Sequence, residues 1–278
     1  MIQNSYDNSP SLYLIPTPIG NLEDITYRAV KVLEEVEVIF SEDTRVTLNL
    51  LNNFGIKKKL ISLHDHNEDI LKEKVLEYLK NGKSVGLVTD RGTPIISDPG
   101  YKTVKYISDN NYNVIAIPGA TAFVPALISS GISSQPFLFY GFLNSKDSKR
   151  RDELEMLKDN EYTIIFYEAP HRILKTLNMM LEIFGNRDIS ISREITKKFE
   201  TIYRGKINDL IANIPEKGEF VIVVSGCGDK NIDFSISIKD AVNLYINAGL
   251  DVMSSIKKVA KERNVPKNEI YKEYHKED

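Results

Sequence analysis

Residues 84–100 read SVGLVTDRGTPIISDPG and join a short strand to an unusual loop. Ser84–Val88 is mostly apolar without strict alternation, which is typical of a strand covered on both faces. The loop Thr89–Gly100 that follows holds two Gly, two Pro and two Asp in twelve residues. Glycine lets a ligand approach the backbone, and proline keeps its neighbours extended. A simple turn needs fewer special residues, so we predict that this loop binds a polar ligand.

Similar apolar runs recur on both sides of this stretch. They are Leu12–Ile15, Val36–Phe40, Val114–Ile117, Phe137–Tyr140, Thr163–Tyr167, Ile189–Ser192 and Phe220–Val224. Stretches with helical spacing lie between them, at Thr26–Val36, Ile70–Leu79, Thr121–Ser130 and Ile173–Phe184. Alternation of strands and helices over this length predicts an α/β fold.

Turn-rich segments suggest how the chain divides. We expect a flexible N-terminus at 1–11, α/β domains at 12–118 and 119–228, and a helical appendage at 229–278. The appendage carries helical patterns at Ile238–Asn247, Asp251–Arg263 and Lys267–Tyr274. Three short helices with tight turns resemble a helix-turn-helix unit. A plain dimerisation or packing bundle fits the same pattern.

The composition excludes several classes of protein. The 278 residues carry a net charge of −3, which excludes a globally basic nucleic-acid binder but not a local basic patch. Cys227 is the only cysteine, so neither a disulfide framework nor a Cys-rich metal site is expected. No apolar run approaches the ~18 residues of a membrane span, and the first residues lack a secretion signal. We expect a cytoplasmic protein.

Three further loops follow predicted strands, where α/β proteins bind ligands. They are Pro16–Leu22, Pro118–Ala122 and Phe166–Arg172. Neither the dinucleotide fingerprint GxGxxG nor a Walker A motif is present. His64-Asp65-His66 invites a metal interpretation, but its spacing is sequential and no third histidine lies nearby. We expect no metal.

Charged residues gather in three places. Ser41–Arg45 follows the second strand, where Asp43 and Arg45 either face a substrate or pair with each other and cap a helix. Residues 168–206 hold eight Lys/Arg against five Asp/Glu, and Lys146–Arg151 form a basic cluster in an expected loop. Such residues suit contacts with RNA phosphates, although a solvated charged loop explains the same pattern.

The motifs at 12–22, 41–45, 90–100 and 166–172, in this order, resemble the small-subunit ribosomal RNA methyltransferase I family. That family is a member of the tetrapyrrole methylase superfamily, whose enzymes use S-adenosyl-L-methionine (SAM). The resemblance covers about residues 12–226, and the appendage is similar to that family's C-terminal region. Arg91 departs from the pattern, because the family usually has a small residue there. Its side chain must point away from the cofactor or line the entrance.

The resemblance implies two α/β domains with SAM in the cleft between them, and a homodimer. It also implies 2′-O-methylation of a cytidine ribose in the decoding region of 16S ribosomal RNA, within the small ribosomal subunit. Carried over by motif, the cofactor contacts are Pro18, Gly92, Thr93, Ile96, Thr121, Ala122, and Tyr167 or Glu168.

Methyl transfer to a ribose hydroxyl requires alignment of oxygen, methyl and sulfur, and a general base can accept the hydroxyl proton. The candidate bases are Glu42, Asp43, Asp90 and Glu194. The candidate RNA contacts are Arg45, Lys149, Arg150, Arg151, Arg193 and Lys197. Two alternatives stay open: a methylase of a small molecule such as a tetrapyrrole, and a non-catalytic ribosome-assembly factor.

Overall fold

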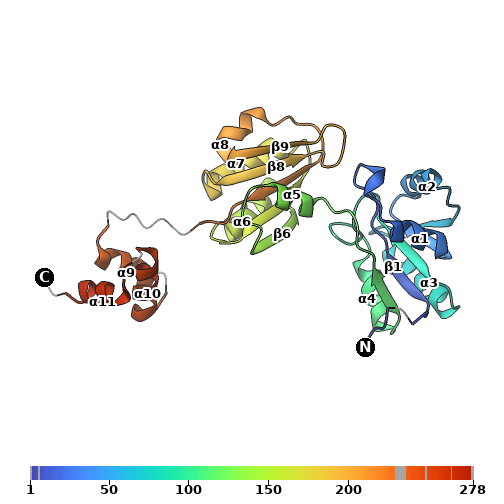
Figure 1. Ribbon diagram of the computed structural model, residues 1–278, viewed down its shortest axis with the longest axis horizontal. Helices are drawn as coiled ribbons and strands as arrows, with labels where there is room; N and C mark the ends of the chain where they lie inside the picture. Colours follow the sequence, from blue (N-terminus) through green and yellow to red (C-terminus); the bar gives the residue numbers. More distant parts are fainter. Residues whose placement is uncertain (1, 6, 229–235, 248, 264, 277–278) are drawn as a thin grey trace.

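The computed structural model describes residues 2–5, 7–228, 236–247, 249–263 and 265–276. Two five-stranded sheets, each with its own helices, follow one another along the chain, and a helical bundle stands at the C-terminal end (Figure 1). The predicted α/β class and the helical appendage are confirmed. The expected domain boundary at residue 229 lies outside the described residues.

The first sheet is parallel throughout, with the order β3-β2-β4-β1-β5. Its strands are β1 (Ser11–Leu14), β2 (Val38–Ser41), β3 (Lys59–Ser62), β4 (Val85–Val88) and β5 (Asn113–Ala116). Every residue of the central strand β4 is buried, because helices cover both faces of the sheet. The carboxyl ends of all five strands therefore meet at one edge, and the loops after β1, β2, β4 and β5 lie together there.

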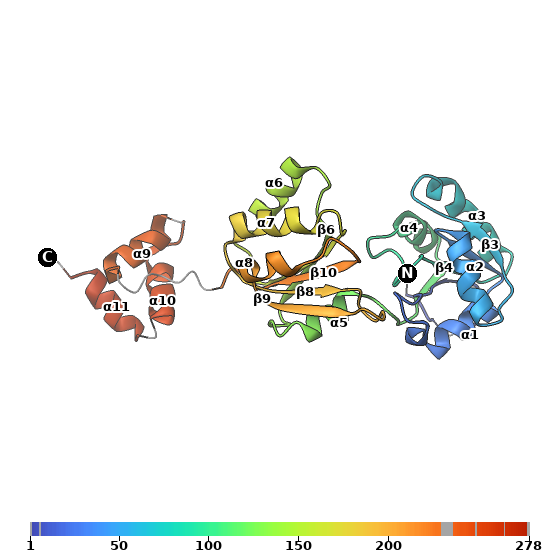
Figure 2. The same ribbon diagram turned by 90° about the horizontal axis from the view of Figure 1, so that it is seen from above.

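The second sheet is mixed, with the order β6-β7-β10-β8-β9. Its strands are β6 (Phe137–Phe142), β7 (Thr163–Glu168), β8 (Asp188–Arg193), β9 (Thr201–Lys206) and β10 (Phe220–Val224). Only β6 and β7 pair in parallel, and β10 runs antiparallel to β7 with Phe220 opposite Glu168. The start of β10 thus lies beside the end of β7, at the edge that faces the first sheet (Figure 2).

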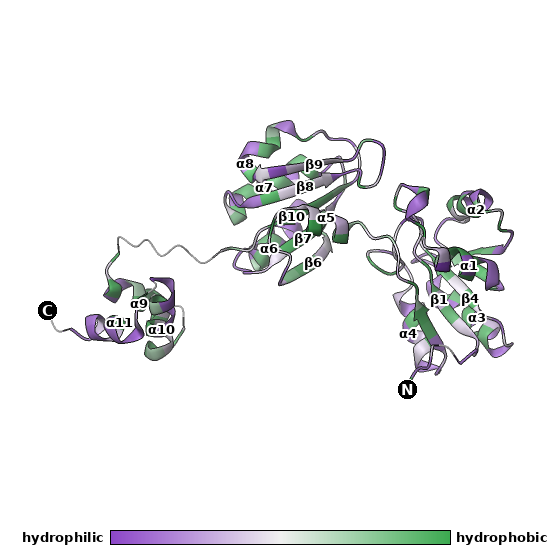
Figure 3. Ribbon diagram, viewed as in Figure 1, coloured by the Kyte–Doolittle hydropathy of each residue, from purple (hydrophilic) through white to green (hydrophobic). Residues whose placement is uncertain are grey.

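Helices complete each α/β unit. With the first sheet come a 3-10 turn at Leu22–Asp24 and the helices α1 (Tyr27–Glu35), α2 (Thr44–Asn53), α3 (Glu68–Lys80) and α4 (Tyr101–Asp109). With the second sheet come α5 (Phe123–Ser129), α6 (Asp147–Leu157), α7 (Ile173–Phe184), α8 (Ile207–Leu210) and a 3-10 turn at Ile211–Asn213. Apolar residues concentrate in the sheets and in the helices packed on them (Figure 3). No described helix is both long enough and apolar enough to cross a membrane.

The appendage contains α9 (Ile238–Asn247), α10 (Val252–Glu262) and α11 (Lys267–Tyr274), close to the predicted helices. These three helices share a core of their own, in which Val242, Ile256 and Ile270 are fully buried. Asp251 caps α10 by accepting hydrogen bonds from the backbone N–H groups of the first turn. A separate core means that the bundle is held together by its own contacts.

The eight predicted strands are confirmed with ends that differ by one or two residues, but β3 and β9 were not predicted. Both are edge strands whose residues are only partly buried, so they lack a continuous apolar run. The prediction of a loop around Lys146–Arg151 is wrong, because these residues begin helix α6. Within the segment expected to be flexible, Gln3 and Ser9 hydrogen-bond to residues of β5.

Candidate active site

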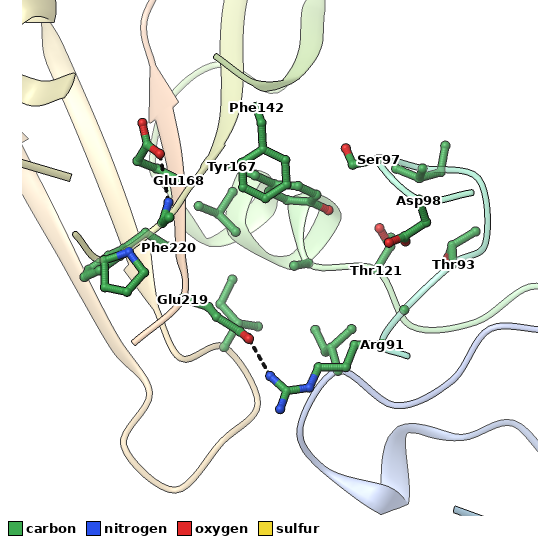
Figure 4. Close-up of a pocket in the computed structure, with 18 residues that line it drawn as sticks. Arg91, Thr93, Ser97, Asp98, Thr121, Phe142, Tyr167, Glu168, Glu219 and Phe220 are labelled. Carbon is green, nitrogen blue, oxygen red and sulfur yellow. Dashed lines mark hydrogen bonds and ion pairs between the residues drawn. The ribbon is translucent and has the colours of Figure 1, made fainter. Parts of the chain in front are cut away.

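A cavity of about 350 Å³ lies between the two sheets, and we call it cavity 1 (Figure 4). The loops after β1 and β4 supply Ile19, Arg91, Gly92, Thr93, Ile96, Ser97 and Asp98. The segment that joins the sheets and the second sheet supply Thr121, Ala122, Phe142, Tyr167, Glu168, Ala169, Pro170, Ile195, Glu219, Phe220 and Val221. One wall is therefore made of polar loops, and the other is largely apolar.

The structure brings most of the expected cofactor residues to this cavity. Gly92, Thr93, Ile96, Thr121, Ala122, Tyr167 and Glu168 all line cavity 1, whereas Pro18 lines a second cavity described below. These seven residues come from two separate loops and the end of strand β7. Their convergence shows that the motifs form one site, while their individual contacts with a cofactor stay predictions.

The β4 loop is held close to the β1 loop at Gly92. Thr17 and Gly92 exchange two backbone hydrogen bonds, of 2.9 and 3.0 Å. Gly92 has a φ of +87°, and a Cβ there would meet the Ile19 side chain at 3.2 Å. The Thr93 hydroxyl donates to the Ala120 carbonyl at 3.0 Å, which ties the same loop to the segment between the sheets. A glycine is required at position 92 for this turn.

Aromatic side chains form the wall on the second sheet. The Tyr167 ring lies with its centroid 5.5 Å from that of Phe142 and 5.0 Å from that of Phe139. Burial raises the pKa of Tyr167, so its hydroxyl stays neutral at physiological pH. Glu168 turns its carboxylate away from the cavity (Figure 4). On that far side the carboxylate accepts from the Thr176 hydroxyl at 2.5 Å and pairs with Arg172 at 3.1 Å. Glu168 thus supports the wall, and its backbone is the part that faces the cavity.

Asp98 and Glu219 are the two ionisable groups of cavity 1 that the sequence analysis did not single out. Burial, together with the negative charge of Glu42, raises the pKa of Asp98 to about 6. Asp98 was part of the predicted binding loop, but its environment depends on Glu42 from a loop far away in the sequence. Only the fold brings the two carboxyls near each other.

Arg91 stands at the rim of cavity 1, as expected for a side chain at the entrance. Its guanidinium pairs with the Glu219 carboxylate from the opposite sheet (Figure 4). Lys197 pairs with the same carboxylate at 2.7 Å and with Glu194 at 3.0 Å. This network of four charged side chains joins the two α/β units above the cavity.

A second cavity of about 490 Å³, cavity 2, lies beside the first one. Its lining residues are Thr17, Pro18, Gly20, Leu22, Val46, Thr47, Asn49, Leu50, Asn53, Thr89, Asp90, Arg91, Glu194 and Lys197. Most belong to the β1 loop, to helix α2 and to the start of the β4 loop. Arg91 is common to both cavities.

The four candidate bases lie in different surroundings. Asp90 and Glu194 line cavity 2, whereas Glu42 and Asp43 line neither cavity. Burial and the charge of Glu42 raise the pKa of Asp90, despite a hydrogen bond from the Asp43 N–H. Burial alone would raise the pKa of Glu194, but the Glu219 N–H and Lys197 hold it below its usual value.

The two candidates that line neither cavity, Asp43 and Glu42, are engaged in other contacts. Asp43 forms a paired hydrogen bond with the Arg45 guanidinium, which lowers the pKa of Asp43 to about 2. Glu42 accepts a hydrogen bond from the Thr89 hydroxyl at 3.0 Å. The interpretation of Asp43 and Arg45 as a helix-capping pair is therefore the one seen in the structure, because Asp43 caps α2.

The candidate RNA contacts also differ in how exposed their side chains are. Arg45 and Lys149 are exposed, whereas the Arg150 side chain is only 1% exposed and contacts Asp147 and Thr176. Arg150 thus stabilises the start of α6 and presents almost no surface to solvent, and the RNA contact expected of it stays a prediction. The other candidates are engaged but accessible: Arg151 pairs with Glu182, Arg193 donates to the Lys217 carbonyl, and Lys197 joins the network above.

Among the described residues, no group of three or more His, Cys, Asp or Glu side chains could hold a metal ion. The His64 ring instead lies 3.3 Å from the Asn67 amide, and Asn67 also accepts from the His64 N–H. This loop thus serves to lead into helix α3.

The family model described as Tetrapyrrole (Corrin/Porphyrin) Methylases matches residues 11–211. The chain belongs to this family. It is 47% identical over 273 residues to "Ribosomal RNA small subunit methyltransferase I" of Bacillus subtilis (strain 168), covering 95% of this chain and 94% of the relative. A protein of the same name from Halalkalibacterium halodurans is 44% identical and covers 99% of both chains.

Solved structures agree with the fold. Diphthine synthase superposes with a TM-score of 0.61 at 13% identity, covering 78% of this chain and 90% of that one. Cobalt precorrin-4 methyltransferase superposes with a TM-score of 0.57 at 17% identity, covering 79% and 96%. At these identities the likeness concerns the fold alone. The family match ends at residue 211, so the appendage lies outside it.

SAM is the methyl donor of this methyltransferase family, and cavity 1 fits it. Gly92 lines the cavity without a side chain, so a ligand can approach the loop backbone closely. Ile19, Phe142 and Val221 offer apolar surface for a flat heterocycle. Asp98 lines the same cavity, and its raised pKa reflects a carboxyl that is partly shielded from water.

Proposed function

We propose that this chain transfers a methyl group from SAM to the ribose 2′-hydroxyl of a cytidine in the decoding region of 16S ribosomal RNA. The observation that carries the proposal is the 47% identity to a small-subunit ribosomal RNA methyltransferase, which extends over 95% of this chain. The cytidine and the 2′-oxygen come from the resemblance of the sequence motifs. The substrate context is the small ribosomal subunit.

In this proposal cavity 1 holds SAM between the β4 loop and the aromatic wall. Gly92, Thr93 and Ile96 contact it from one side, and Thr121, Ala122 and Tyr167 from the other. The backbone at Glu168 completes this set, whereas Pro18, expected at the cofactor from its motif, lines cavity 2 on the other side of the same loop. When bound, SAM supplies a methyl group on a positively charged sulfur, so departure of the thioether needs no acid. The protein has to align the reacting atoms, which can contribute ~7–11 kcal/mol.

Asp90 is the general base that the geometry favours among the four candidates. It lies at the start of the loop that lines cavity 1, yet its side chain lines cavity 2. Burial raises its pKa, and a more basic carboxylate accepts a proton more readily. Glu194 shares cavity 2, but its pKa is lowered, and its carboxylate already accepts from Glu219 and Lys197.

In this proposal, accessible cations of both α/β units hold the RNA. Arg45, Lys149, Arg151, Arg193 and Lys197 are the contacts that we propose, and the buried Arg150 is left out. The separate core of α9–α11 suits a second contact with the ribosomal subunit, tethered to the catalytic unit. We propose that the enzyme acts as a homodimer in the cytoplasm, with domains at 12–118 and 119–228 and the appendage at 229–278.

Mass mapping of 16S ribosomal RNA tests the assignment. Cells that lack this protein should lose one ribose methyl group on a decoding-region cytidine, and the purified protein with SAM should restore it on their small subunits. An unchanged methylation pattern would exclude the proposal. SAM binding without transfer to RNA would favour a small-molecule methylase, and absence of SAM binding would favour an assembly factor.

A further inference from the structure

Cavities 1 and 2 are the two sides of one wall. Three backbone segments form this wall, and in each of them residues one or two positions apart line opposite cavities. In the β1 loop, Ile19 lines cavity 1, whereas Pro18 and Gly20 line cavity 2. In the β4 loop, Gly92 lines cavity 1 and Asp90 lines cavity 2. After β8, Ile195 lines cavity 1 and Glu194 lines cavity 2. The Thr17–Gly92 hydrogen bonds join two of these segments. Arg91, at the rim, faces both sides.

Helix α2 supplies the far side of cavity 2. Val46, Asn49, Leu50 and Asn53 recur at the three- and four-residue spacing of one helix face, so one surface of α2 is turned to the cavity. Thr47 also lines it, and its side chain is buried, at 2% exposure. Among the described residues its hydroxyl has no hydrogen-bond partner. A buried hydroxyl without a partner is costly, and it marks the one buried polar group of this helix face whose hydrogen bond is missing among the described residues.

The chemistry of this lining fits one unit of an RNA chain. Leu22, Val46 and Leu50 give apolar surface for the face of a base, and the amides of Asn49 and Asn53 can both donate and accept at a base edge. Arg91 and Lys197 give two cations at the rim for a phosphate. Asp90 lies toward the wall, where a ribose hydroxyl would approach cavity 1.

We propose that cavity 2 receives the target nucleotide of the RNA, withdrawn from its base stack, with the α2 face around the base. This inference rests on the proposed function and adds the substrate site to it. Arg91 is then a positioning residue that exchanges its contact with Glu219 for the phosphate of the nucleotide. The exchange brings the ribose over the rim of the wall toward the methyl group.

Two substitutions on helix α2 separate this proposal from a general loss of structure. Val46→Trp fills cavity 2 from the α2 face. Leu48→Trp is the matched control, because Leu48 is also exposed, at 49%, but lies on the opposite side of the helix and lines neither cavity. Transfer of labelled methyl from SAM to unmethylated small subunits gives kcat/KM, and calorimetry gives the affinity for SAM.

We expect Val46→Trp to lower kcat/KM for the subunit by about ten-fold or more with unchanged affinity for SAM, and Leu48→Trp to behave as wild type. Equal kcat/KM for the two variants would overturn the assignment of cavity 2. If Val46→Trp loses SAM binding as well, the exposed Asn49→Ala decides: a raised KM for the subunit supports the site, and an unchanged KM overturns it. A wild-type protein that methylates no subunit would instead contradict the proposed function itself.

Discussion

Cavities 1 and 2 share a wall, but different parts of the fold build them. Cavity 1 needs both sheets: loops from the first and an aromatic wall from the second. Cavity 2 is built almost entirely from the first sheet and helix α2, with Glu194 and Lys197 closing it. The parallel sheet thus contributes polar side chains to both cavities, because all its carboxyl ends meet at one edge. The mixed sheet mainly contributes apolar surface to one.

The carboxyl groups of the two cavities also differ. Burial raises the pKa of Asp98 in cavity 1 to about 6 and also raises the pKa of Asp90 in cavity 2, whereas Glu194 in cavity 2 is held below its usual pKa by a backbone N–H and a lysine. Cavity 2 therefore combines a carboxyl of raised pKa with one of lowered pKa. In the proposed assignment of the cavities this pair lies on the substrate side, where Asp90 can accept a proton while Glu194 stays ionised beside Lys197.

The largest effect is expected for Thr93→Arg, which should abolish binding of SAM in cavity 1 and leave cavity 2 unchanged. The arginine would fill the cavity and remove the hydroxyl that donates to Ala120. We expect affinity for SAM to fall by more than about 100-fold, or about 2.7 kcal/mol, while binding to small subunits persists. Calorimetry with SAM and a subunit-binding assay measure the two. Thr93→Ser keeps the hydroxyl and should bind SAM nearly as wild type; equal affinity in Thr93→Arg would refute the placement of SAM.

Asp90→Asn should act on the other side of the wall. The amide oxygen can still accept the hydrogen bond from the Asp43 N–H, but the side chain can no longer take a proton. We expect kcat for methyl transfer to fall by about 10²–10⁴-fold with both binding affinities retained. Asp43→Asn removes the competing carboxyl outside both cavities and should change kcat little. If Asp43→Asn is the slower enzyme, the base is misassigned.

The smallest effect is expected in the pH dependence of stability. Because the folded state raises the pKa of Asp98 from 3.8 to about 6, the stabilisation from its proton is present below pH 3.8 and is lost as the pH rises through 6. Allowing for solvent screening, this amounts to about 1 kcal/mol. Urea unfolding should therefore show that Asp98→Asn gains stability over wild type between pH 4 and pH 7. A constant difference across this range would contradict the raised pKa.

Much of the fold was predictable because buried strands carry an unmistakable apolar pattern. Strand β10, with all five residues buried, was found to the residue. The edge strands β3 and β9 were missed, since an edge strand half exposed to water does not need continuous apolar residues. The charged residues at the start of helix α6 predict a loop, because the burial of this helix depends on Arg150, Leu154 and Leu157 among many charged neighbours.

The site was predictable where one loop carries its own signal. The glycines and prolines of the β4 loop marked cavity 1, because backbone geometry restricts which residues a position accepts. The Arg91–Glu219 pair and the α2 face could not be found in this way. They depend on residues that meet only after the sheets have formed, and Val46 or Asn49 carries no local sign of facing a cavity.

The alternation of neighbouring residues across the shared wall has an evolutionary consequence. A substitution in the wall changes the lining of both cavities at once, so an accepted residue must be compatible with both. The face of α2 borders a single compartment and can change without disturbing the other. In the proposed assignment of the cavities, new acceptor molecules would be acquired by replacing the α2 surface, while the cavity for the methyl donor stays the same.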